Sequence, residues 1–214
     1  MLTSISLKGP AIEIIVGSEI PSSEKTDQRE TWWLPKNLVS ACSETLNAAC
    51  NRDFKEKEEN CILLVEDDPE IFSLYVEWLY YDTYTIPSKY PQGTRSMTDA
   101  EAWVLGDKLL SKDFKNYAMS RIYQHYLRFD GFSMKPVLLD DISYVLENTS
   151  ENSGLREFFI DYVCANFSKT TVVIGSTSDW DDVLLAHDDA RKRMFDSIRN
   201  PVSIKPLDQY NEKP

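Results

Sequence analysis

A continuous apolar run, Cys61-Ile62-Leu63-Leu64-Val65, stands shortly before a strong helix start. A run this short and this apolar is typical of a strand that is buried on both faces. Asp68 can cap the helix that follows, Pro69 suits its first position, and Glu70 favours the positive end of its dipole. The chain is therefore expected to contain a buried central strand that leads directly into a helix.

Two more strands and a helix are expected before this run. Residues Ala11–Val16 are rich in β-branched side chains and predict a strand, and Thr31–Leu34 can pair with it as a hairpin. The apolar residues then change to helical spacing, which predicts one helix over residues 36–50. The period of the pattern thus changes from two residues to about 3.6 within the first part of the chain.

A helix pair is expected after the strand–helix unit. Residues Asp82–Met97 are polar and predict an exposed loop. Thr98 and Glu101 have the spacing of a capping box, so a helix is expected to begin there. Ser111 is expected to cap the next helix, which continues past Ile122.

The second half of the chain is expected to be a helical extension. The last of its expected helices, Trp180–Ile198, has a predicted cap formed by Ser178 and Asp181. The periodicity of that helix is interrupted near His187. Helical periodicity covers Met134–Leu146, Leu155–Phe167 and Trp180–Ile198.

Two segments of this half lack helical periodicity. Residues Thr171–Ile174 fit either a short strand or a buried loop, and the pattern leaves both open. Residues 200–214 contain three prolines and few apolar side chains, so they are expected to form a loose, flexible tail.

Charge and cysteine usage exclude several classes of function. The formal net charge is −12, and a domain this acidic repels phosphate backbones, so no nucleic-acid partner is expected. The four cysteines form no CxxC pair and lie far from both histidines, so no zinc site and no disulfide framework are expected. No apolar run reaches the length of a membrane helix, and no export signal is recognisable, so a cytoplasmic or nuclear protein is expected.

Several short motifs resemble, in the same order, those of the BTB/POZ family. They extend over about residues 10–127, and Ser43 matches a serine typical of the family's first helix. Ile142–Thr149 and Gly154–Arg156 resemble the segment after the BTB domain in many small fungal proteins. The matching motifs are Trp32–Val39, Phe54–Glu56, Cys61–Leu64, Asp67–Phe72, Trp78–Tyr80, Leu105–Leu109 and Lys115–Ala118.

The resemblance implies an α/β (α+β) fold, with a small sheet flanked by a cluster of helices. It divides the chain into an N-terminal segment (1–10), a BTB/POZ domain (11–127), an all-helical C-terminal extension (128–199) and the tail (200–214). Pro35 stands where the family usually has a histidine, which makes the start of the first helix atypical. About ten residues precede the first strand, too few for the arm that some BTB dimers exchange, so a homodimer of that kind is in doubt.

The resemblance also implies a non-catalytic function in protein–protein interaction. Some BTB proteins are substrate adaptors of cullin-based ubiquitin ligases and contact the cullin through a hydrophobic residue followed two positions later by glutamate. Phe54, Lys55 and Glu56 match this pattern and are the predicted partner-binding residues, although Phe54 could equally close the core. The alternative is a self-associating scaffold that binds no cullin.

The sequence offers little support for an enzyme. No phosphate-cradling GxGxxG or GxxxxGK loop and no GxSxG motif occurs, and His125 and His187 accompany no nucleophile motif. No cofactor and no metal are therefore expected, and an enzyme would need a site that forms only in three dimensions. The adjacent Trp32 and Trp33 must point to opposite faces of a strand, so one of them is expected to lie exposed or to be covered by another element.

Overall fold

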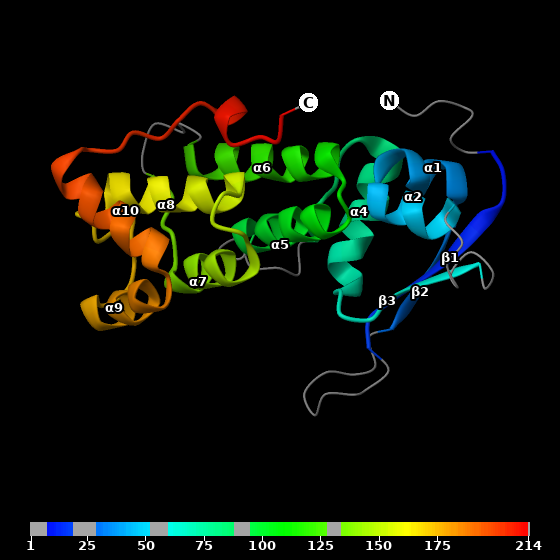
Figure 1. The fold of residues 1–214 in the computed structure, drawn as a ribbon, viewed down its shortest axis with the longest axis horizontal. Coiled ribbons are helices and arrows are strands. Elements are labelled where there is room, and N and C mark those ends of the chain that lie inside the picture. Colours follow the sequence, from blue (N-terminus) through cyan, green and yellow to red (C-terminus); the bar gives the residue numbers. More distant parts are fainter. Residues whose placement is uncertain (1–7, 19–28, 52–59, 88–94, 128–133, 214) are drawn as a thin grey trace. The chain divides into compact units, whose positions relative to one another are not determined.

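A computed structural model describes residues 8–18, 29–51, 60–87, 95–127 and 134–213. They form helices and one small mixed sheet, in agreement with the mixed α and β class expected (Figure 1). The chain divides into two compact units, residues 1–117 and 118–214. The sequence places the end of the first domain at residue 127, but the two units divide inside helix α6 (Lys112–Leu127).

The sheet of the first unit has three strands in the order β2-β1-β3. Strand β1 (Ala11–Val16) pairs antiparallel with β2 (Glu30–Pro35), which confirms the predicted hairpin. It pairs parallel with β3 (Cys61–Leu64) on its other side. The alternate residues Ile12, Ile14 and Val16 are fully buried, so one face of the sheet packs on the core.

Strand β3 is not the central strand that the apolar run predicted. In the described part of the sheet β1 is central, and β3 lies at the edge. Ile62 is buried, whereas Leu63 is 53% exposed. An apolar run indicates that both faces of a strand could be buried, but in this fold only one face of β3 packs against the core.

The predicted helix over residues 36–50 is two helices. Helix α1 (Lys36–Cys42) ends at Ser43, whose backbone is extended, and α2 (Glu44–Asn51) begins after it. The Ser43 hydroxyl donates a hydrogen bond to the Leu109 carbonyl at 2.6 Å and accepts one from the Leu46 amide at 3.0 Å. Ser43 is buried, so its side chain stabilises the break and ties it to the end of α5 (Arg95–Lys108).

Replacing Ser43 by alanine is expected to lower the free energy of unfolding by about 1–3 kcal/mol, because the buried Leu109 carbonyl loses the closer of its two donors and the Leu46 amide loses its acceptor. Thr45→Ala is the control, since Thr45 makes an exposed hydrogen bond to the adjacent Lys108 carbonyl at 3.1 Å. Urea titration of both variants measures the difference. Equal midpoints for Ser43→Ala and Thr45→Ala would contradict this role for Ser43.

Helix α4 (Pro69–Tyr81) begins as the sequence predicts. Asp68 is its N-cap, and the carboxylate accepts a hydrogen bond from the Glu70 amide at 2.7 Å. One face of α4 carries Tyr75 and Trp78 into an aromatic cluster. Both features could be predicted because the cap depends on the residues at the helix start and the buried face depends on the spacing of apolar residues along the helix.

The capping box predicted at Thr98 does not form. Helix α5 begins at Arg95, which places Thr98 and Glu101 inside it. Asp99, in the same turn, is buried and accepts a hydrogen bond from the Tyr84 hydroxyl at 2.6 Å. Thr98 and Glu101 have the spacing of a capping box, but the helix already begins three residues before Thr98, so this spacing does not mark its start.

The second unit contains most of α6 and four further helices of the described chain. They are α7 (Leu139–Asn148), α8 (Gly154–Asn166), α9 (Thr177–Ala186) and α10 (Asp188–Arg199). The break between α9 and α10 lies at His187, as predicted. Figure 1 shows α9 and α10, in orange, as neighbours that lie beside the yellow α8.

The cap of α9 lies two residues before the predicted one. Ser176 is the N-cap, and it forms a capping box with Asp179 instead of the expected pair Ser178 and Asp181. For residues 171–174 the sequence leaves open a short strand or a buried loop. Val172 and Val173 are buried in turns, and Val173 forms an isolated bridge with Val137, so this is a buried loop and not a strand.

Residues 200–213 are packed, in contrast to the loose tail that the composition predicted. They contain a 3-10 turn, η2 (Leu207–Gln209), and Tyr210 is 2% exposed. The Tyr210 hydroxyl donates to the Asp161 carboxylate at 3.0 Å and accepts from the Lys205 amide at 2.8 Å. Lys205 also forms an ion pair with Glu157, so a few side chains hold the segment although they barely change its average composition.

Candidate protein-binding site

The predicted partner-binding residues Phe54, Lys55 and Glu56 lie outside the described residues. They fall between the end of α2 at Asn51 and the start of β3 at Cys61. Their contact with a cullin therefore stays a prediction.

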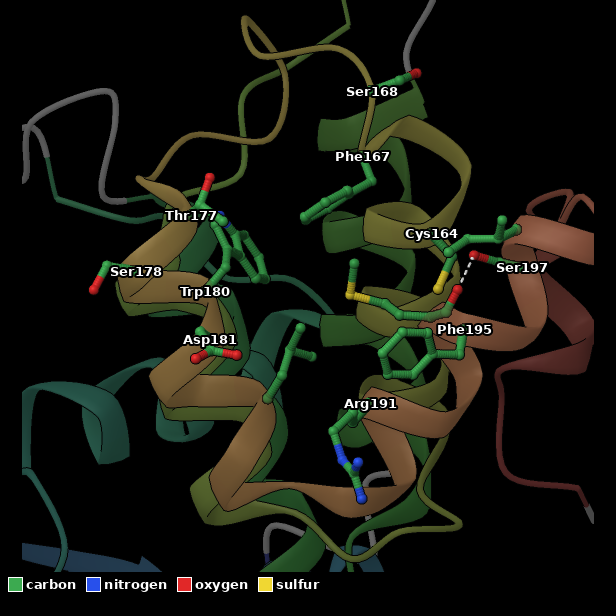
Figure 2. Close-up of a pocket in the computed structure, with 13 residues that line it drawn as sticks. Cys164, Phe167, Ser168, Thr177, Ser178, Trp180, Asp181, Arg191, Phe195 and Ser197 are labelled. Carbon is green, nitrogen blue, oxygen red and sulfur yellow. Dashed lines mark hydrogen bonds between the residues drawn. The ribbon is translucent and has the colours of Figure 1, made fainter.

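A groove lies in the described part of the second unit. It has a volume of about 870 Å3 and lies between α9, α10 and the C-terminal end of α8 (Figure 2). Most of its exposed lining surface is apolar. Its lining residues are Cys164, Phe167, Ser168, Thr177, Ser178, Trp180, Asp181, Leu184, Arg191, Met194, Phe195, Ser197 and Ile198.

Two stripes of side chains form the long walls of this groove. On α9 the lining residues recur at helical spacing from Thr177 through Trp180 to Leu184. On α10 they recur from Arg191 through Phe195 to Ile198. A stripe at i, i+3 or i+4, and i+7 is one face of a helix. Each helix therefore turns one face toward the groove.

The floor of the groove is part of the core of the second unit. Trp180 is 4% exposed and contacts Phe167 edge to face, with ring centroids 5.7 Å apart. Gly175 makes room for the indole, because a methyl group there would lie 2.7 Å from Nε1, and its φ of +140° also favours glycine. Leu184 and Met194 line both the groove and a small apolar cavity beneath it.

The side of the rim that α10 forms is apolar. Phe195 is 63% exposed and Ile198 is 77% exposed, and Figure 2 shows the Phe195 ring beside the hollow. Large apolar side chains that gather at a hollow, in contrast to single ones scattered over a surface, are typical of a binding site.

Two charged side chains line the groove. Arg191 forms an ion pair with Asp188 of its own helix, a carboxylate that Lys192 shares. Asp181 is exposed, and no described residue forms an ion pair or hydrogen bond with it. Burial raises the pKa of the Cys164 thiol, which disfavours the reactive thiolate form.

Two ion pairs fix α10 to α8 and so hold the groove open. The Arg156 guanidinium donates to both oxygens of Asp189, at 2.7 and 2.8 Å. Arg193 donates to Asp161, a fully buried carboxylate, at 2.7 Å. The hydrogen bond from Arg156 lowers the pKa of Asp189. The wall formed by α10 is therefore anchored by side chains that point away from the groove.

The first unit has an apolar surface of its own, the outer face of the sheet. Trp33 is 62% exposed, whereas Trp32 contacts Phe72 edge to face, so the predicted division of this pair is confirmed. The register places Ile15 beside Leu63.

The ionisable side chains of the described residues were compared with the requirements of a metal site. No group of three His, Cys, Asp or Glu residues in this part of the chain is placed to hold a metal ion. His125 packs edge to face on Tyr126, and burial lowers its pKa. Over the same residues, no helix combines the length and the apolarity that crossing a bilayer requires.

No protein-family model matches this chain, and no curated protein matches it significantly.

Proposed function

We propose that this protein is a non-catalytic protein–protein interaction module of the BTB/POZ type. The observation that carries the proposal is the apolar groove of the second unit, in which Phe195 and Ile198 are exposed beside an already folded core. Exposing such side chains to water is unfavourable unless a partner covers them. The module acts, in this proposal, in the cytoplasm or the nucleus.

The order of elements supports a BTB/POZ-type first unit. The resemblance implies a strand, a hairpin strand, a helix, a third strand and then helices, and the described elements follow that order except that the first helix is divided into α1 and α2. Two residues that belong to the resembling motifs define ends of helices: Ser43 separates α1 from α2, and Asp68 caps α4.

The sharper form of the proposal is a substrate adaptor for a cullin-based ubiquitin ligase. Phe54 and Glu56 would contact the cullin, with Lys55 between them, and the groove of the second unit would hold the substrate. An adaptor needs two such separate surfaces. The alternative, a self-associating scaffold, is favoured by the outer face of the sheet with its exposed Trp33 and Leu63.

The test is a calorimetric titration of the full chain with a cullin N-terminal domain. Micromolar binding corresponds to about −8 kcal/mol, and a Phe54→Ala/Glu56→Ala variant is expected to bind at least about tenfold more weakly. Glu58→Ala is the matched control, because it removes one acidic charge from the same segment.

Loss of binding in the variant but not in the control supports the adaptor form. No heat from a folded wild-type chain contradicts it. Sedimentation velocity of the same sample then tests the scaffold form, which requires a concentration-dependent dimer or larger assembly.

A further inference from the structure

We infer that the groove between α9 and α10 binds one amphipathic helix of a partner protein, with apolar side chains along one face and a lysine or arginine that meets Asp181. This inference rests on the proposed interaction function and names the chemistry of the partner. It does not depend on cullin binding, which involves a different part of the chain.

The walls of the groove favour a helix over an extended peptide. The stripes on α9 and α10 repeat about once per helical turn, so their side chains form ridges about 5.4 Å apart. The ridges of a third helix have the same spacing and fit between them. An extended peptide gains most of its affinity from an open strand edge, and the described part of this unit has no strand, only the isolated bridge between Val137 and Val173.

The exposed apolar side chains supply the binding energy. Phe195 and Ile198 stand on one wall of the groove, while Leu184 and the edge of Trp180 belong to the opposite wall. A helix placed between them would remove apolar surface from water on both sides at once. A central aromatic side chain such as Phe195 is typical of the few residues that dominate the energy of an interface.

The charges of the groove select a basic partner. Arg191 already has Asp188 as its partner, so Asp181 is the one charged lining residue without a partner among the described residues. Helix α9 also carries Asp182 and no lysine or arginine. A basic residue on the flank of the bound helix that faces α9 would therefore be attracted, and an acidic one repelled.

The groove exists before any partner arrives, which limits the cost of binding. Arg156 and Arg193 hold α10 on α8 through Asp189 and Asp161. The partner helix then has only itself to order, whereas two loose walls would also have to be ordered.

The test is selection from a displayed library of amphipathic helices, with the full chain as the target. The residues along the apolar face and both flanks of the helices are randomised. Enriched helices are expected to carry apolar residues at i, i+3 or i+4, and i+7, with a lysine or arginine on one flank. Their affinities are then measured by fluorescence anisotropy as synthetic peptides.

A matched pair of variants locates the binding site. Phe195→Asp is expected to weaken the selected peptides at least about tenfold, because it places a charge at the apolar rim. Leu185→Asp is the control, since Leu185 is equally exposed on α9 but does not line the groove. Both side chains lie at the surface, so circular dichroism should show the same fold and thermal midpoint for the two variants.

A charge reversal tests the partner chemistry. Asp181→Lys is expected to weaken peptides with a basic flank and to favour peptides in which that residue is glutamate. Asp182→Lys makes the same change in net charge on the same helix without lining the groove, so its effect should be much smaller.

Three results would overturn the inference: equal enrichment on the Phe195→Asp target, selected helices without a basic flank, or a wild-type dimer that Phe195→Asp converts to a monomer. The last result would identify a second copy of this chain as the occupant. Failure of the cullin titration leaves all these measurements unchanged, so the two proposals fail separately.

Discussion

Replacing Arg156 by leucine is expected to lower the free energy of unfolding of the second unit by about 3–5 kcal/mol. Arg156 is 3% exposed and its guanidinium makes two hydrogen bonds to Asp189. It also donates to the Leu146 carbonyl at 2.5 Å and to the Thr149 carbonyl at 3.3 Å. Leucine fills part of the space but removes the hydrogen bonds that the Asp189 carboxylate and the two carbonyls receive from the guanidinium.

Urea unfolding measures this loss, and hydrogen exchange of the amides in α8 and α10 assigns it to the second unit. Arg191→Leu is the control, because Arg191 is paired with Asp188 at the surface, where an ion pair contributes about 0–1 kcal/mol. Similar losses of free energy in the two variants would contradict the prediction that the buried Arg156 stabilises the fold more than the surface residue Arg191.

The same ion pair has a definite pH dependence. The pKa of Asp189 is lower in the folded protein than in the unfolded chain, so the pair stabilises the fold above the ordinary aspartate pKa of about 3.9. This contribution is lost as the pH falls through the lowered pKa. The difference in stability between wild type and Arg156→Leu should therefore shrink below about pH 4.

Replacing Phe114 by alanine is expected to destabilise the first unit by about 3–5 kcal/mol. Phe114 is fully buried in α6, and its ring contacts three other aromatic rings. The centroid distances are 5.0 Å to Tyr75, 5.3 Å to Trp78 and 5.8 Å to Tyr84. Alanine leaves a cavity among rings that the surrounding backbone holds apart.

Near-ultraviolet circular dichroism reports this cluster directly, and urea unfolding gives the loss of free energy. Trp33→Ala removes a larger ring, but one that is 62% exposed, so it should cost much less. A larger loss for Trp33→Ala would show that the outer face of the sheet is covered in solution, for example by a second copy.

Local signals in the sequence predicted the elements whose ends are defined by their own residues. Asp68 and Pro69 mark the start of α4, and His187 marks the break before α10. The cap of α9 was misplaced because Ser176-Thr177-Ser178-Asp179-Trp180-Asp181 contains the same spacing twice. Only the earlier register forms in the fold, where Trp180 is buried against Phe167.

Features that depend on a distant partner were harder to predict. The edge position of β3 depends on which strand pairs with β1, and the order of residues 200–213 depends on contacts of Tyr210 with Asp161. The sequence did show the periodicity of Trp180–Ile198 that forms the groove. Periodicity identifies an apolar face, but it does not distinguish a face that packs inside the chain from one that stays open.

The position of Asp161 links the groove to residues 200–213, which follow α10 directly in the sequence. This buried carboxylate accepts hydrogen bonds from Arg193, on the α10 wall, and from Tyr210. Residues 200–213 and the α10 wall of the groove are therefore held by the same carboxylate. Replacing Tyr210, or removing the residues that follow α10, is therefore expected to loosen the wall that α10 forms as well.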